Sequence, residues 1–230
     1  MSEDGRAKRH WDPAASTPAW VQKRRLASAM RLVIERLVPS DAPEAELRLA
    51  ADGLERYAEA LRAHPRLRRV MGAPESANAG DVGAFFDQSP LIGLANPLAP
   101  PITINQSGPE TALGQVTFGS AYEGPPGCVH GGFIAAAFDE VLGYVQSLSG
   151  SPGMTGTLTV KYLKPTPLHI ELAFEGRLIG TEGRKIFTEG RVRAGEEVTA
   201  EAHGLFISVD LARMEALAEA RDQVEAERTR

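Results

Sequence analysis

Apolar side chains recur at spacings of three and four residues in two stretches near the start of the chain, which is typical of amphipathic helices. The first stretch spans residues 18–38, and its apolar positions are Leu26, Met30, Val33, Ile34 and Leu37. The second follows Ser40 and Pro43, which suit a helix start, and runs until Pro65. Its apolar positions are Leu47, Leu54, Tyr57 and Leu61. Both stripes need a surface to pack against.

Residues 72–101 are rich in Gly, Pro, Asn and Ala but include Phe85, Phe86, Leu91, Ile92 and Leu94. A loop with so many apolar residues is expected to lie on another surface. Phe85 and Phe86 are explained equally well by that docking and by covering a ligand channel. We therefore divide the chain into an N-terminal helical extension with this loop (residues 1–100), a main domain (101–210) and a C-terminal helix (211–230).

After residue 100, apolar and polar positions alternate as in strands. The predicted strands span residues 102–106, 114–119, 155–164, 168–179, 184–193 and 198–209. Residues 133–148 interrupt them with a helix that is apolar or small almost all round. Such a helix must be wrapped, and a curved antiparallel sheet is the available wrapper. The pattern predicts an α+β domain in which four consecutive hairpin-connected strands follow this central helix.

The turn that leads into this helix carries the candidate chemistry. Gly131 and Gly132 have no side chains to cover their N–H groups, and a helix start attracts negative charge. Asp139 lies inside the apolar run, where a carboxylate needs a partner or a function. A carboxylate together with an amide-lined helix start is suited to attack on an acyl carbonyl.

The spacing of these groups indicates how they act. Gly132 and Asp139 are seven residues apart, which separates them by ~10 Å along a helix. If both act on one carbonyl, one of them comes from a second copy, which predicts an antiparallel homodimer with two composite sites. The alternative is that Asp139 and the adjacent Glu140 only face solvent or the dimer partner.

Composition and charge exclude several classes of ligand and of cellular location. The net charge of -5 and pI of about 5.6 give no general attraction to nucleic acid or anionic membrane. The charged N-terminus lacks an apolar core of signal-peptide length, and there is no apolar run of 18 residues, so we expect a cytoplasmic protein without a membrane partner. The five histidines show no metal-binding spacing. Cys128, the single cysteine, is expected to be a small buried thiol rather than a nucleophile.

Residues 112–210 resemble the hotdog-fold acyl-CoA thioesterases of the phenylacetate-degradation (PaaI-like) type, and are especially similar to thioesterase superfamily members 4 and 5. The motifs that carry the resemblance are Glu123-Gly-Pro-Pro-Gly, Val129-His-Gly-Gly, Asp139, Met154-Thr155, Tyr162-Leu-Lys-Pro165 and Glu182-Gly-Arg-Lys185. The resemblance implies a hotdog fold around the central helix. It also implies no cofactor, since coenzyme A is part of the substrate.

The resemblance further implies roles for individual residues. Asp139 would act as general base or nucleophile, with Thr155 positioning the water or the carboxylate. The Gly131 amide would hold the oxyanion, with Gly132 beside it and His130 ordering the turn. Arg184 and Lys185 are candidates for coenzyme A phosphate contacts, although solvated charge is an equal alternative after a tight turn.

The expected activity is hydrolysis of acyl-CoA to free acid and coenzyme A, in fatty acid metabolism, by a homodimer or a tetramer. Relatives acting on small acyl groups often have Asn where this chain has Gly124, which leaves room and favours a medium to long or bulky acyl chain. A noncatalytic acyl-CoA or lipid-binding protein is the alternative from another class. An enoyl-CoA hydratase or dehydratase is less favoured, because no second acid-base side chain accompanies Asp139 and Thr155.

Overall fold

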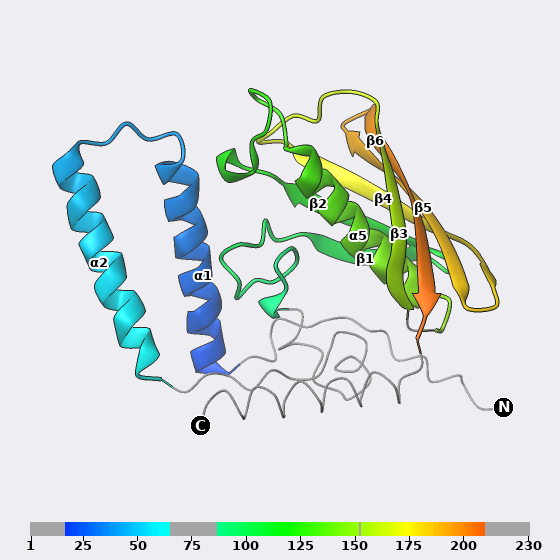
Figure 1. The fold of residues 1–230 in the computed structure, drawn as a ribbon, viewed down its shortest axis with the longest axis horizontal. Coiled ribbons are helices and arrows are strands. Elements are labelled where there is room, and N and C mark those ends of the chain that lie inside the picture. Colours follow the sequence, from blue (N-terminus) through cyan, green and yellow to red (C-terminus); the bar gives the residue numbers. More distant parts are fainter. Residues whose placement is uncertain (1–16, 65–86, 152, 210–230) are drawn as a thin grey trace.

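The computed structural model describes residues 17–64, 87–151 and 153–209. One antiparallel sheet packs against one central helix, and two further helices lie beyond the helix side (Figure 1). The helices are α1 (Pro18–Leu37), α2 (Glu44–Arg62), the short 3-10 helix η2 (Ser120–Tyr122) and α5 (Gly131–Ser147). The strands are β1 (Thr103–Gly108), β2 (Thr111–Thr117), β3 (Gly153–Tyr162), β4 (Glu171–Glu182), β5 (Lys185–Ala194) and β6 (Glu197–Ser208).

The six strands have the order β1-β2-β4-β5-β6-β3, so β3 lies at an edge beside β6. The prediction of four consecutive hairpin-connected strands was therefore wrong for β3 and β4, which do not pair. The segment between them includes Pro165 and Pro167, which cannot donate main-chain hydrogen bonds. It crosses instead to the turn before α5, where the Val129 N–H donates to the Thr166 carbonyl oxygen at 2.8 Å.

Helix α5 lies unusually close to the sheet because glycines face it. A Cβ atom on Gly114 of β2 would lie 2.5 Å from Val141, and one on Gly176 of β4 would lie 2.8 Å from Val145. Neither distance is tolerated between carbon atoms, so larger residues would push the helix outward. The buried face of α5, which packs on this inner surface, comprises Ile134, Ala137, Phe138, Val141, Leu142, Val145 and Gln146.

The opposite face of α5 is only partly covered by the described residues. Gly132 and Ser147 are exposed there, and Ala136 and Gly143 are half-buried. Within a single chain, the sheet thus covers one face of the helix, as predicted, and leaves the other face open. The open face consists of small residues and borders Asp139.

Strand β3 contains a bulge that changes which of its side chains face α5. Thr155 pairs with Phe206 and Thr157 pairs with Leu205, so Gly156 is an extra residue in β3. Side chains alternate along a regular strand, and the extra residue shifts this alternation by one. Thr155 consequently shares the inner face of the sheet with Tyr162, although the two are separated by an odd number of positions.

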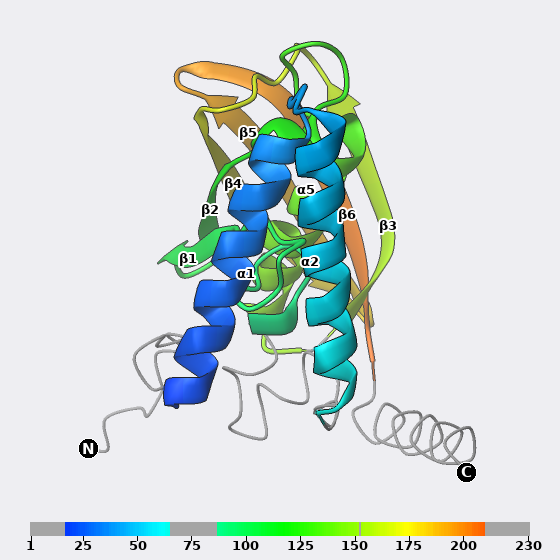
Figure 2. The same ribbon diagram turned by 90° about the vertical axis from the view of Figure 1, so that its left-hand side faces the viewer.

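Helix α1 docks onto the domain through polar contacts with residues 87–99 and η2 (Figure 2). Asp87 is fully buried, and its Oδ2 accepts from the Trp20 indole and from Arg24 Nε at 2.6 Å. At the other end of α1, Glu35 accepts from the Ser120 N–H at 2.8 Å and from its hydroxyl at 3.0 Å. Residues 87–99 therefore do lie on other surfaces, as predicted for this loop, whereas Phe85, Phe86 and residues 211–230 lie outside the described residues.

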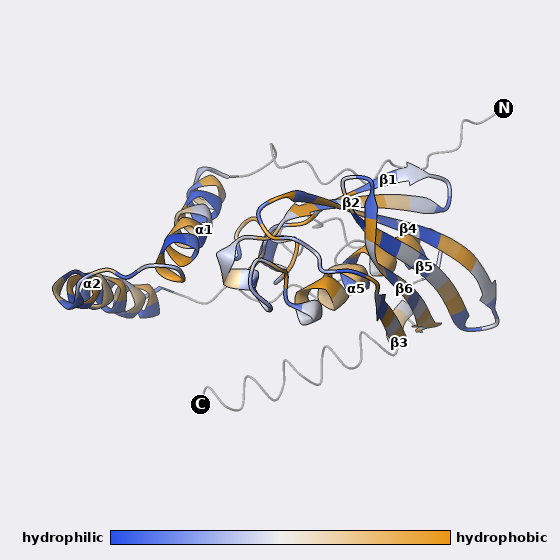
Figure 3. Cartoon of the chain, turned by 90° about the horizontal axis from the view of Figure 1, so that it is seen from above, coloured by the Kyte–Doolittle hydropathy of each residue, from blue (hydrophilic) through white to orange (hydrophobic). Residues whose placement is uncertain are grey.

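Helix α2 buries none of its residues, and the apolar side chains of its stripe remain 42% to 49% exposed. Figure 3 shows hydrophobic positions along α2 at a distance from the sheet. The partner surface expected for this stripe is thus not supplied by residues 17–64, 87–151 or 153–209. No helix in these ranges is long and apolar enough to cross a membrane.

The buried carboxylate of Asp87 should matter more for stability than an exposed ion pair. Asp87→Asn removes the charge that faces Arg24 and is expected to lower the free energy of unfolding by about 2 to 3 kcal/mol. Glu189→Gln breaks the exposed pair with Arg177 and should cost less than about 1 kcal/mol. Urea unfolding at neutral pH measures both, and equal losses would contradict the structural role of Asp87.

Candidate active site

His130 caps the start of α5 and engages one of the two glycine amides that follow it. The Gly132 N–H donates to His130 Nδ1 at 3.0 Å, which leaves the imidazole proton on Nε2. Gly132 is therefore not a bare donor, contrary to expectation. The Gly131 N–H, by contrast, has no acceptor within the part of the chain that the structure describes. The helix start thus presents one free amide.

The turn before α5 holds His130 tightly. The His130 N–H donates to the Tyr122 carbonyl oxygen at 2.8 Å, and the imidazole meets the Phe133 ring edge-on. A Cβ atom on Gly124 would lie only 2.8 Å from His130 Cα. The space beside Gly124 is therefore taken by His130, and the preference for a medium to long or bulky acyl chain stays a prediction.

Asp139 and Thr155 meet at the middle of α5. The Thr155 hydroxyl donates to Asp139 Oδ1 at 2.8 Å, from the first half of β3. Thr155 is exposed and Asp139 is half-buried, so a substrate can reach both side chains. The structure therefore brings together the two residues that lie sixteen positions apart in the sequence, and their catalytic role stays a prediction.

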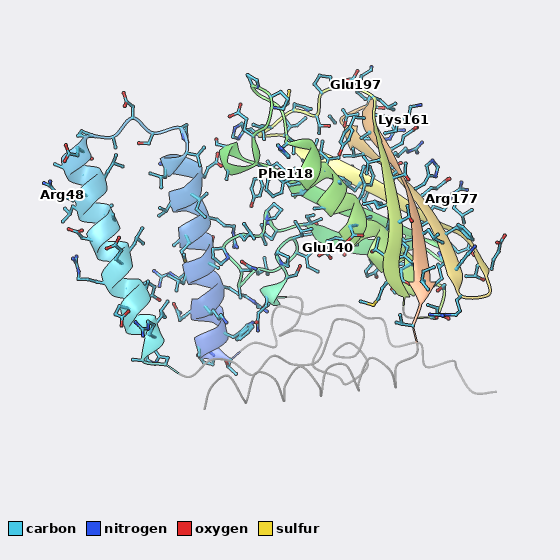
Figure 4. The ribbon with its side chains drawn as sticks, in the orientation of Figure 1. Arg48, Phe118, Glu140, Lys161, Arg177 and Glu197 are labelled. Atoms are coloured by element: carbon cyan, nitrogen blue, oxygen red, sulfur yellow. The ribbon has the colours of Figure 1, made fainter. Side chains whose placement is uncertain are left out.

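Glu140 lies on the flank of α5 that faces residues 87–99 (Figure 4). Its Oε1 accepts from the Ser89 hydroxyl at 3.3 Å, and Ser89 is itself buried. Burial raises the pKa of Glu140; the Ser89 hydrogen bond opposes this rise, and the neighbouring Asp139 charge adds to it. The two adjacent acids thus have different surroundings, one beside β3 and the other beside the loop.

Tyr162, at the end of β3, contacts the start of α5. Its hydroxyl donates to the Gly131 carbonyl oxygen at 2.7 Å. Sequence reasoning noted Tyr162 only as part of a motif and assigned it no role. The odd spacing from Thr155 hid the fact that both side chains face the helix, because the Gly156 bulge is not evident from alternation alone.

Arg184 and Lys185 lie at the end of the sheet where β3 begins. Lys185 pairs with Ile207, which in turn pairs with Met154 beside Thr155. The Arg184 guanidinium donates to the Ser208 carbonyl oxygen at 3.0 and 3.1 Å, while Lys185 is exposed. A phosphate role for these two exposed residues remains a prediction.

Other candidate features lie apart from this arrangement. Cys128 is half-exposed rather than buried, so that expectation was wrong. Among the described residues, no three His, Cys, Asp or Glu side chains are grouped to hold a metal ion. An open depression of about 720 Å³ lies on the outer face of the sheet, near Arg177 in Figure 4, and both of its arginines are paired with its glutamates. It contains none of the candidate residues.

Comparison with known proteins places this geometry in a family. Residues 126–201 match the thioesterase superfamily model. The chain is 38% identical over 94 residues to acyl-coenzyme A thioesterase THEM4 of Bos taurus, covering 40% of this chain and 38% of that protein. It is 30% identical over 95 residues to acyl-coenzyme A thioesterase THEM5 of Homo sapiens, with coverage of 40% and 38%. These alignments therefore span about two fifths of each curated relative.

One solved structure is similar over most of its length. It is described as a thioesterase superfamily protein, has a TM-score of 0.73 and is 32% identical, covering 85% of this chain and 97% of that chain. The chain belongs to the thioesterase superfamily, and its domain has the hotdog fold. The likeness to that structure covers more residues than the domain alone, so it extends into the helical extension.

Because the pKa of Glu140 is raised, the free energy of unfolding should depend on pH through this residue. The folded state favours protonated Glu140, so as pH rises above the ordinary glutamate range, near 4.3, the unfolded chain ionises first and the folded state loses stability. Glu140→Gln removes this loss and keeps an acceptor for Ser89. We expect the variant to gain stability relative to the parent chain as pH rises from 4 to 8. Urea unfolding across this range measures the difference.

The control is Glu182→Gln, which changes an exposed glutamate at the end of β4. Its stability should follow that of the parent chain at every pH. A constant difference between Glu140→Gln and the parent chain would contradict the effect of burial on Glu140.

Proposed function

We propose that the protein hydrolyses acyl-CoA thioesters to a free carboxylic acid and coenzyme A. The observation that supports this most directly is the Asp139–Thr155 hydrogen bond, on the same helix whose start presents the free Gly131 N–H. Membership of the thioesterase superfamily and similarity to two acyl-coenzyme A thioesterases support the same reaction.

In the proposed reaction, the thioester carbonyl oxygen accepts a hydrogen bond from Gly131 N–H. Asp139 either removes a proton from water as the water oxygen attacks the carbonyl carbon, or attacks that carbon itself. The Thr155 hydroxyl holds Asp139 Oδ1 and so directs Oδ2 toward the reacting atoms. The C–S bond then breaks, and the coenzyme A thiolate takes up the proton that Asp139 removed from water. On the route in which Asp139 attacks, the thiolate takes its proton from the water that then cleaves the acyl–Asp139 anhydride. On both routes water supplies the new acid oxygen and the Asp139 carboxylate is restored.

One chain does not place Gly131 and Asp139 at a common carbonyl, because eight residues separate them by ~12 Å along α5. We propose that two copies form a homodimer in which each site combines Gly131 of one copy with Asp139 of the other. Two features support this arrangement. The small-residue face of α5 is open, and β3 is an edge strand whose Met154 side chain is exposed. Unpaired strand edges favour pairing with another chain.

The proposed role of Asp139 is tested by Asp139→Asn. The rate of hydrolysis is measured as release of free thiol from a panel of short, aromatic and long acyl-CoAs. It should fall by about 10² to 10⁴ because the base or nucleophile is lost. The control Asp52→Asn changes an exposed aspartate of α2 and should leave the rates unchanged. Unchanged rates in Asp139→Asn would reject the assignment.

The same panel separates the alternative functions. A noncatalytic acyl-CoA or lipid-binding protein would bind acyl-CoA tightly without releasing thiol. An enoyl-CoA hydratase would add water to an enoyl-CoA with the thioester left intact. Free coenzyme A as the product is the outcome that distinguishes hydrolysis from both.

The composite site is tested by combining two defective chains. Gly131→Pro removes the free N–H at the first position of α5, where proline suits a helix and where His130 already has the extended backbone that precedes proline. It should lower kcat by about 10² to 10³. Gly131→Ala places a similar Cβ against Tyr162 but keeps the N–H, and serves as the steric control.

Gly131→Pro and Asp139→Asn chains with different tags are then co-expressed, and the heterodimer is purified on both tags. If each site combines groups from both chains, one site of the heterodimer contains both defects and the other contains neither. The heterodimer should then have about half of the wild-type activity. A heterodimer no more active than its parents would place both groups of each site in one chain. Failure to recover any doubly tagged assembly would contradict the homodimer.

A further inference from the structure

Tyr162 contacts the helix start at the residue that offers the free amide. Its hydroxyl donates to the Gly131 carbonyl oxygen at 2.7 Å. Its ring also occupies the space beside Gly131, because a Cβ atom there would lie 3.2 Å from both Cζ and Oη of Tyr162. The tyrosine therefore contacts the position where other residues would carry their own side chain.

The peptide unit between Gly131 and Gly132 is held at both edges. Its carbonyl oxygen accepts from Tyr162, and its N–H donates to His130 Nδ1 at 3.0 Å. Because a peptide unit is planar, two such contacts fix its orientation. The Gly131 N–H belongs to the preceding peptide unit, whose His130 carbonyl oxygen accepts from the Phe133 N–H at 2.9 Å. Glycine has no Cβ to restrict the dihedral angles that join the two units, so the contacts of the second unit limit how far the first can turn.

The Tyr162 hydrogen bond is not needed to satisfy the Gly131 carbonyl. A carbonyl at the first position of an α-helix already accepts a main-chain hydrogen bond from the residue four positions later. Oxygen has a second lone pair, and Tyr162 uses it. Tyr162 is also 52% exposed, so removing its hydroxyl leaves no buried polar group unpaired. A large contribution to stability is therefore not expected from this bond.

We propose that Tyr162 is a positioning residue that keeps the Gly131 N–H aimed at the developing oxyanion. The proposal rests on the proposed thioester hydrolysis and extends it to a residue that does not touch the substrate carbonyl. Tyr162 and His130 together hold the peptide unit that follows the Gly131 N–H, which limits rotation of this N–H about the Gly131 dihedral angles. A preorganised donor lowers the barrier more than a donor that must be oriented during the reaction.

The test uses Tyr162→Phe, which keeps the ring beside Gly131 and removes only the hydroxyl. With the acyl-CoA that the wild-type chain hydrolyses fastest, we expect kcat to fall about 10- to 100-fold and KM to stay within about twofold. The melting temperature should change by less than about 2 °C. Tyr57→Phe removes the hydroxyl of an exposed tyrosine on α2 and should alter none of these values.

A spectroscopic measurement separates positioning from a general loss of structure. An acyl-CoA with a ¹³C-labelled thioester carbonyl is bound to Asp139→Asn, and its infrared carbonyl band should shift to lower frequency than in solution. In the double variant with Tyr162→Phe, the band should move back toward the solution value and broaden. An identical band in both variants overturns the positioning role.

The kinetic outcomes distinguish this inference from the function on which it rests. A wild-type chain that releases no thiol from any acyl-CoA overturns the proposed function and the role of Tyr162 with it. A wild-type chain that hydrolyses acyl-CoA beside a Tyr162→Phe variant with the same kcat overturns the role of Tyr162 alone. A variant with a lowered melting temperature and raised KM but unchanged kcat also overturns the role of Tyr162, because that pattern indicates that the hydroxyl only stabilises the fold.

Discussion

The close seating of α5 on the sheet is the contact on which the rest of the domain depends. Val141 and Val145 rest where Gly114 and Gly176 have no side chains, and Leu142 lies above Gly190 in the same way. Interiors are packed without room for an extra methyl group, so these glycines determine the depth and the rotation of the helix. With the helix in this position, Asp139 contacts Thr155 of β3 and Glu140 contacts Ser89 in residues 87–99.

Much of this arrangement follows from local pattern. Alternation located all six strands, and the unbroken apolar run located α5 between the second and third of them. The pairing of Asp139 with Thr155 was expected from the family resemblance and not from local pattern, and the structure brings the two side chains together. A helix start with free amides at Gly131 and Gly132 was predicted, but His130 accepts from the Gly132 N–H, and only the Gly131 N–H is left. Alternation and helical spacing give no information about such side-chain hydrogen bonds.

Other features depend on contacts between distant segments. The edge position of β3 follows from a crossover, and strand alternation alone does not distinguish a crossover from a hairpin. The Ser89–Glu140 and Trp20–Asp87 contacts join residues more than fifty positions apart that have no periodic relation. One overlooked signal was present: glycines inside predicted strands, such as Gly176 and Gly190, often mark a close approach of another element.

The Gly156 bulge makes the length of β3 sensitive to insertions and deletions, although β3 is an edge strand. Edge strands usually tolerate changes of length, since one side is free. Here Thr155 must meet Asp139 and Tyr162 must meet Gly131, and both contacts need the same face of the strand. A single-residue insertion or deletion that keeps the bulge reverses the parity of the strand and turns one of the two side chains outward. Homologous chains that keep both contacts are therefore constrained to differ here by even numbers of residues, or to lose the bulge together with its extra residue.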